Sequence, residues 1–234
     1  MIISSLQETL LKFNTSGISA TVLNAAAGQR ISGRAIIVNV GAADAYVHGP
    51  FPTALPPLQS VTVVDAEVSG SHLVVFKITD TPSAIAADAR AQWHDFYGSR
   101  GAVGDFPELL RSPQLSVGRV ALDKAVILRQ PELPAEVTDF EVLLNLWFSP
   151  AGTACGIHNQ HDFIEVHTQL TGFGRMQKFS TKSAGTIYEE YLLSPAATNP
   201  ATFCHADGAT FEYPWHQYFA DTDCVWLAVE YHAL

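Results

Sequence analysis

The sequence predicts an all-β protein with one or two short helices. Runs of four to eight residues rich in valine, isoleucine, threonine and aromatic residues recur along most of the chain. Glycine, proline and asparagine separate these runs, as they do at the turns of antiparallel sheets. Hydrophobic residues make up 47% of the chain and charged residues only 15%, so much of the chain must lie in an interior.

The N-terminal part combines one helix-like segment with several strands. Residues 4–13 have helical spacing, with a serine able to cap and a glutamate near the first turn, which predicts a helix. Strand-like runs follow at residues 20–23, 35–40, 45–48, 60–64 and 72–78. These strands could form a degenerate first barrel or a sheet that extends a second one.

Residues 82–98 differ in character from the strands before them. They are rich in alanine, and Ser83 is able to cap, which predicts a helix. The segment from Gly98 to Gly104 is typical of a linker, and a shorter helix is expected near residues 106–111. The sequence therefore predicts an N-terminal β-rich region with a connecting helix over residues 1–98 and a barrel over residues 105–234.

Strand-like runs resume in the C-terminal half. They lie at residues 115–120, 124–128, 141–148, 175–179, 186–193, 202–204 and 225–231, and a further strand is expected from His161 onward. Eight short strands with turns at this spacing predict a jelly roll, or double-stranded β-helix.

A histidine cluster lies near the middle of this half, at residues 158–167. His158, His161 and His167 lie within ten residues together with Glu165, and His216 follows much later in the chain. On a strand, alternate side chains share a face, which here carries His161, Phe163, Glu165, His167 and Gln169. Neutral imidazoles and one carboxylate suit a divalent transition metal such as iron, manganese, nickel, cobalt or zinc.

Over residues 140–234 the chain resembles the cupin family in two motifs. The spacing His161-x3-Glu165-x6-Gly172 matches the second half of the first cupin motif. The spacing Gly208-x5-Pro214 matches the opening of the second motif. The resemblance implies a metal site inside the jelly-roll barrel.

Two positions depart from the cupin pattern. Asn159 stands where the first histidine of the first motif is expected, and His216 stands where the second motif has a glycine. The resemblance assigns His161, Glu165 and His216 as ligands by position and leaves the fourth ligand open between His158 and His167. His158 would face away from the site unless a bulge re-aims it, whereas His167 shares a face with Glu165.

The resemblance also implies a small-molecule enzyme. Iron(II) is the favoured metal, with zinc, manganese, nickel or cobalt as alternatives, and a mononuclear non-haem iron dioxygenase is the favoured activity. A metal-dependent isomerase or lyase and a non-catalytic ligand-binding barrel are the alternatives. Tyr188 and Tyr218 are expected as general acid or base, because a nearby cation can lower the pKa of a phenol. Arg175 and Lys178 are expected to contact a substrate carboxylate.

Composition excludes some partners. The formal net charge of −10, with only 13 lysines and arginines spread along the chain, argues against a nucleic-acid partner. No apolar run reaches the ~20 residues that span a bilayer, and no signal peptide is visible. Three cysteines fit a reduced, cytoplasmic setting. We expect a small-molecule substrate and a homodimer.

Overall fold

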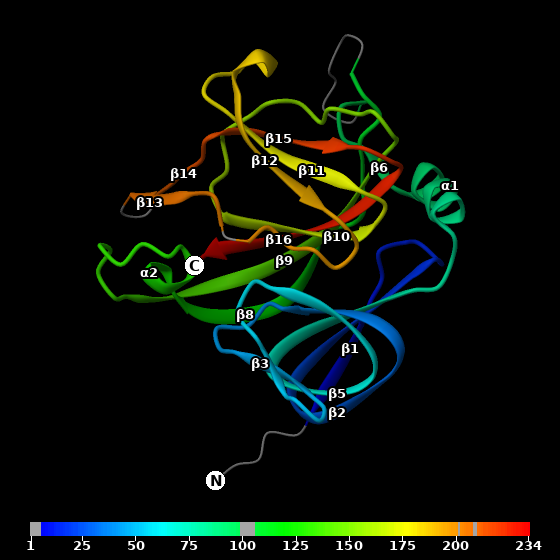
Figure 1. Cartoon of the computed structure of the whole chain (residues 1–234), viewed down its shortest axis with the longest axis vertical. Coiled ribbons are helices and arrows are strands. Elements are labelled where there is room, and N and C mark those ends of the chain that lie inside the picture. Colours follow the sequence, from blue (N-terminus) through cyan, green and yellow to red (C-terminus); the bar gives the residue numbers. More distant parts are fainter. Residues whose placement is uncertain (1–5, 99–105, 201, 208–209) are drawn as a thin grey trace.

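The computed structural model describes residues 6–98, 106–200, 202–207 and 210–234, and its all-β character confirms the predicted fold class (Figure 1). Its helices are α1 (Pro82–Gln92) and α2 (Lys124–Ile127). The strands are β1 (Gln7–Leu11), β2 (Ile18–Asn39), β3 (Ala45–His48), β4 (Thr53–Leu55), β5 (Ser60–Ile78), β6 (His94–Asp95), β7 (Leu110–Arg111), β8 (Leu115–Asp123), β9 (Val137–Ser149), β10 (Ile164–Thr171), β11 (Gly174–Phe179), β12 (Ile187–Leu193), β13 (His205–Asp207), β14 (Thr210–Glu212), β15 (Trp215–Ala220) and β16 (Cys224–Ala233). None of these helices has the length and apolar character to span a membrane.

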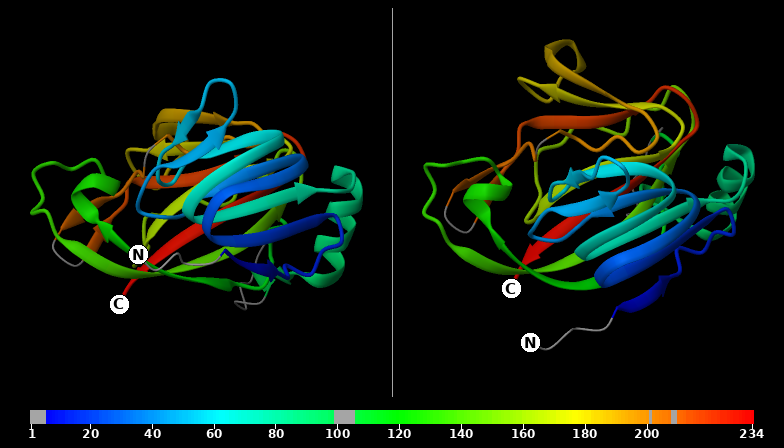
Figure 2. Two further views of the ribbon diagram at one scale, coloured as in Figure 1. Left: turned by 90° about the horizontal axis from the view of Figure 1, so that it is seen from below. Right: turned by 60° about the horizontal axis from the view of Figure 1, so that its bottom comes forward.

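The N-terminal strands form one long, coiled hairpin. The runs predicted at residues 20–23 and 35–40 both belong to β2, and those at 60–64 and 72–78 both belong to β5. The two strands pair from Ile18 opposite Ile78 to Val38 opposite Ser60, and Val38 pairs a second time with Val74. Irregularities in the register bend the hairpin until its own strands meet again (Figure 2).

Two larger sheets and the two-stranded sheet β13-β14 lie beyond this hairpin (Figure 1). The middle sheet has the order β10-β16-β9, with β8 and β7 also paired to β9. The upper sheet has the order β12-β11-β15. The two sheets face each other, as expected for a jelly roll, and Tyr218 of the upper sheet stacks on Trp226 of the middle sheet with ring centroids 3.9 Å apart.

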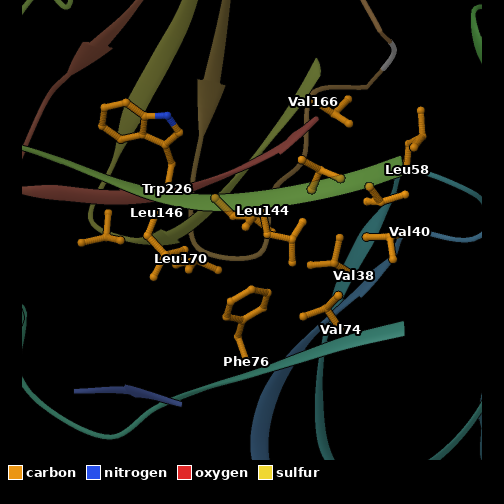
Figure 3. Close-up of a cluster of buried hydrophobic side chains, with 14 of the residues drawn as sticks. Val38, Val40, Leu58, Val74, Phe76, Leu144, Leu146, Val166, Leu170 and Trp226 are labelled. Atoms are coloured by element: carbon orange, nitrogen blue, oxygen red, sulfur yellow. The ribbon is translucent and has the colours of Figure 1, made fainter. Parts of the chain in front are cut away.

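The two faces of the middle sheet differ in polarity. One face is apolar and packs on the hairpin, where Leu144 and Leu146 lie toward Val74 and Phe76, while Trp226 projects to the other side (Figure 3). Hydrophobic side chains of the hairpin and of the C-terminal sheets belong to one core cluster. The other face carries alternate residues of β10, namely Glu165, His167 and Gln169, and all three are buried.

The predicted helix at residues 4–13 is wrong. Gln7–Leu11 form β1, which pairs with β2 along its whole length, from Gln7 opposite Asn24 to Leu11 opposite Ala20. Pairing with a distant segment overrides the weak local preference for a helix. Residues 1–5 lie outside the described residues.

The predictions for residues 82–111 are only partly right. α1 ends at Gln92, and Thr81 rather than Ser83 caps it, because the Thr81 hydroxyl accepts a hydrogen bond from the amide of Ala84. No helix is found at residues 106–111, where β7 pairs with β6 and β9. Of the expected linker, only Gly98 belongs to the described residues.

Two predicted strands in the C-terminal half are also wrong. Residues 124–127 form α2, because the carboxylate of Asp123 accepts a hydrogen bond from the amide of Ala125 and turns the chain at the end of β8. Residues 202–204 precede β13, and the ring of Phe203 packs edge-on against the ring of His216. Local apolar character did not distinguish these segments from strands.

Gly172 has a backbone conformation that only glycine adopts easily. Its φ is +72°, and an added Cβ would collide with the carbonyl oxygen of Asp223. We expect Gly172→Ala to lower the free energy of unfolding by more than the ~1–3 kcal/mol typical of backbone strain alone. Thermal unfolding measures the change, with Gly152→Ala as the control, because Gly152 has a φ of +78° and open space around it. Equal losses in both variants would refute the collision.

Candidate metal centre

His158 reaches the site through a loop that runs along β15. The amide of His158 donates to the carbonyl of His216 at 3.0 Å, and the amide of His216 donates to the carbonyl of His158 at 2.8 Å. The strand expected from His161 begins only at Ile164, so His158 and His161 both precede β10. No bulge in β10 is therefore needed to aim His158, since its pairing with β15 sets its direction.

Three histidines converge at this place. The ligating nitrogens of His158, His161 and His216 all lie within 4.8 Å of one another. Among the described residues, these three histidines form a cluster that could hold a metal ion. The Nε2 atoms of His161 and His216 are 3.1 Å apart. Two nitrogens that each lie ~2.0–2.1 Å from one ion are separated by about 3 Å when they are neighbours in its coordination sphere. The observed spacing fits shared coordination.

Backbone carbonyls fix the tautomers of two of these histidines. Nδ1 of His216 lies 2.8 Å from the carbonyl of Pro214, and Nδ1 of His158 lies 3.0 Å from the carbonyl of Gly156. In a neutral imidazole, an Nδ1–H that donates to a carbonyl leaves Nε2 as a bare acceptor. Metal-ligating histidines are commonly oriented by such hydrogen bonds, so the donor set fits a transition metal.

Glu165 lies beside the three histidines at the start of β10. Its carboxylate is 3.8 Å from Nε2 of His161 and 3.2 Å from Nε2 of His167. Burial raises the pKa of Glu165, but attraction to His167, the hydrogen bond from His167 and attraction to the other imidazoles lower it to about 2. The Tyr213 hydroxyl accepts a hydrogen bond from the Glu165 amide at 2.9 Å and donates to the carbonyl of Phe163. The carboxylate is thus ionised and held in place.

Burial favours the neutral form of two of these histidines. Desolvation is the main cause that lowers the pKa of His216 to about 3, and it also lowers the pKa of His161. The imidazole of His216 is therefore available as a ligand well below the usual histidine range, and the shift of His161 has the same direction. Their availability leads to a pH prediction for metal content.

Metal content should persist through mildly acidic pH and then fall. The sequence alone predicts loss near the ordinary histidine pKa of ~6.5. Protons compete with metal for the imidazoles, and because the pKa of His216 is lowered to about 3, this competition begins at lower pH. Equilibrium dialysis followed by elemental analysis between about pH 7 and pH 3 measures the midpoint. Complete loss near ~6.5 would contradict the buried site.

The structure separates the two tyrosines that sequence analysis named as acid or base. Tyr188 lies on β12 with 57% of its side chain exposed. Tyr218 is buried on β15 and donates to the amide oxygen of Gln169. Burial raises the pKa of Tyr218.

The side chains of Arg175 and Lys178, which were expected to contact a substrate, also point in different directions. Arg175 forms ion pairs with Glu190 and Asp221. Lys178 lies opposite His216 in the pairing of β11 with β15 and forms an ion pair with Glu189 at 2.6 Å. Residues opposite each other in antiparallel strands share a face, so Lys178 is on the same side of the upper sheet as His216.

A cavity of about 730 Å³ opens beside His161, and its lining includes Phe163, Phe211, Glu212 and Tyr213.

Phe203 was not identified from the sequence. It lies outside both motifs, and its ring contacts the ring of His216. The proline two residues before His216 is the only nearby sequence signal, and it does not identify Phe203 or Glu212.

No cysteine belongs to the three-histidine cluster of the described residues. Cys155, Cys204 and Cys224 are free and buried. Burial raises the pKa of the Cys155 thiol to about 12, and its sulfur lies 3.7 Å from the Ser149 hydroxyl. The thiol therefore stays protonated at neutral pH when no cation is bound.

Comparison with known proteins finds similarity among solved structures. No protein-family model matches the chain, and no curated protein matches it. The chain is similar to an oxalate decarboxylase of Bacillus subtilis with Mn(II) centres, at 9% identity and a TM-score of 0.33, over 98% of this chain and 73% of that chain. It is similar to a vicilin of Corylus avellana at 9% identity and a TM-score of 0.32, over 99% and 82% of the two chains. It is also similar to a cupin 2 conserved barrel domain protein of Leptotrichia buccalis at 9% identity and a TM-score of 0.30, over 97% and 89%.

These are proteins of the cupin fold, the fold that the two sequence motifs predict. With 9% identity and TM-scores of 0.30 to 0.33, the similarity carries no argument about the chemistry of this chain. The function must be argued from the geometry of the site.

Proposed function

We propose that the chain binds one divalent transition metal through His158, His161, His216 and Glu165. The observation that carries this proposal is the convergence of three imidazoles within 4.8 Å, two of them with Nδ1 against a backbone carbonyl. Three imidazoles and a carboxylate favour iron, manganese, nickel, cobalt or zinc over calcium and magnesium, which prefer oxygen ligands.

His158 rather than His167 is the proposed fourth ligand. Nε2 of His158 is left free by the hydrogen bond of Nδ1, and its ring centroid is 4.4 Å from that of His216. Nε2 of His167 instead lies 3.2 Å from Glu165. In this arrangement His167 orients the carboxylate of Glu165, as residues around a metal site often orient its ligands.

The favoured activity is that of a mononuclear non-haem iron dioxygenase acting on a small molecule. Iron(II) held by histidines and one carboxylate supplies, when bound, the redox chemistry that such enzymes use with dioxygen. The residues of the chain hold and shield the site: Tyr213 fixes the start of β10, and Phe203 covers the ring of His216. The open cavity beside His161 gives a substrate access.

The reaction class is tested by oxygen uptake. Protein reconstituted with iron(II) under anaerobic conditions should consume oxygen with an enediol, catechol or thiol substrate, whereas zinc-substituted protein should not. Equal turnover of one substrate by both metal forms without oxygen would favour the alternative, a metal-dependent isomerase or lyase. Binding without turnover in any metal form would indicate a ligand-binding barrel. A cytoplasmic homodimer stays a prediction from the sequence.

A further inference from the structure

The cavity beside His161 has two walls, and both lead to proposed metal ligands. One wall is formed by residues 159–163, which include His161 and precede β10. The other wall is formed by residues 211–213 at the end of β14, and His216 follows on β15. The volume of about 730 Å³ lies within the ~300–1,000 Å³ of pockets that enclose small molecules. A molecule in this cavity therefore lies next to the proposed metal.

The charged side chains of this cavity are acidic. Asp162 comes from one wall and Glu212 from the other, and among the described residues no lysine or arginine lines the cavity. Neither carboxylate lies within ion-pairing distance of a basic side chain of the described chain. In contrast, Glu190 of β12 forms an ion pair with Arg175. The two walls thus present two negative charges that no neighbouring cation neutralises.

Aromatic rings stand beside both carboxylates. Phe163 follows the carboxylate of the first wall, and Phe211 and Tyr213 flank that of the second. The ring centroids of Phe163 and Tyr213 lie 5.3 Å and 4.7 Å from that of His161. The aromatic surface therefore continues to a proposed metal ligand. The face of an aromatic ring carries partial negative charge, so it attracts cations as the carboxylates do.

The basic side chains that were expected to meet a substrate carboxylate are engaged elsewhere. Lys178 lines a different cavity, of about 90 Å³, and forms an ion pair with Glu189. Arg175 forms ion pairs with Glu190 and Asp221. The lining of the large cavity, as far as the described residues form it, thus offers no basic group to an anion and favours a cation.

We infer that this cavity selects substrates that carry an ammonium group, which lies between the carboxylates of Asp162 and Glu212 and against the neighbouring aromatic rings. The inference rests on the proposed function, because it names the substrate class of the proposed metal site. A protonated amine can donate hydrogen bonds to carboxylate oxygens and present its charge to ring faces at the same time. The volume of the cavity leaves room for a second group of the same substrate beside His161.

Two compounds of nearly equal shape test the inference. 2-Phenylethylamine is a cation at neutral pH, and 2-phenylethanol is its neutral counterpart. In ligand-observed NMR at low ionic strength, with the full chain first without metal and then loaded with zinc, we expect the amine to bind about tenfold more tightly than the alcohol. Added salt should weaken the binding of the amine only. Equal affinities, amine binding that does not respond to salt, or no amine binding would overturn the inference.

Glu212→Gln is the decisive variant, because it removes one negative charge and keeps the shape of the side chain. Affinity for the amine should fall about fivefold, while affinity for the alcohol and metal content stay unchanged. Glu67→Gln is the matched control, because Glu67 is exposed on β5 and lies in the hairpin. Equal amine affinities in the two variants would contradict the inference.

Metal content is measured separately on the same preparations. Protein that takes up metal but does not bind the amine would refute the inference and leave the proposed metal site standing. Protein that binds the amine but takes up no metal would refute the proposed metal site and leave the preference of the cavity for cations standing.

Discussion

His216→Ala should purify with almost no bound metal. The imidazole of His216 is 1% exposed, lies 3.1 Å from that of His161 and is aligned by the carbonyl of Pro214. Loss of an outer partner alone lowers metal affinity about 10–100-fold, so loss of a ligand should lower it by about 100-fold or more. His161→Ala should behave in the same way. Elemental analysis of the purified variants gives the result.

The control is His94→Ala, because His94 is exposed on β6 and belongs to no histidine cluster in the described residues. Circular dichroism must show that each variant folds. Full metal occupancy in both His161→Ala and His216→Ala would sink the proposed site. His158→Ala and His167→Ala separate the alternatives for the fourth ligand: metal retained in the first and lost in the second would replace His158 by His167.

Spacing in the sequence was sufficient to predict the parts of the site that lie on regular strands. Alternation along β10 placed Glu165 and His167 on one face, and the structure has both buried beside each other. The position of His158 was not predictable in the same way, because the residues before Ile164 form a loop whose course depends on backbone pairing with β15. Alternation along a strand does not predict which distant segment pairs with a loop.

The N-terminal fold shows a similar limit. Strand patterns located the apolar runs of β2 and β5, but not that each pair of runs forms one continuous strand. Gly28 and Gly33 do not end the strand, because β2 passes through both with φ values of +70° and +73° at irregularities of its register. The coil is revealed by the second pairings of Ile36, Ile37 and Val38, which pair with Phe76, Val75 and Val74 as well as with the other end of β5.

The coiled hairpin shares a core with the C-terminal sheets, which leads to a stability prediction for Phe76. Phe76 is fully buried on β5, stacks on Phe13 with ring centroids 6.3 Å apart and lies toward Leu144 and Leu146 of β9 (Figure 3). Phe76→Ala should lower the free energy of unfolding by about 3–5 kcal/mol, because it leaves a cavity in a shared core. Val64→Ala is the control on the same strand, since Val64 is 55% exposed and its loss should cost about 0.5 kcal/mol or less.

The two probes of unfolding decide whether the core is shared. A loss of this size should lower the melting temperature by about 6–20 °C for a chain of this length. In a Trp93→Phe background, the remaining tryptophans are Trp147, Trp215 and Trp226. All three lie in the C-terminal half, so their fluorescence reports on that half. We expect this fluorescence to shift together with circular dichroism in Phe76→Ala. A fluorescence transition that stays at the wild-type temperature while circular dichroism moves would mean that residues 1–98 unfold on their own, as a separate domain.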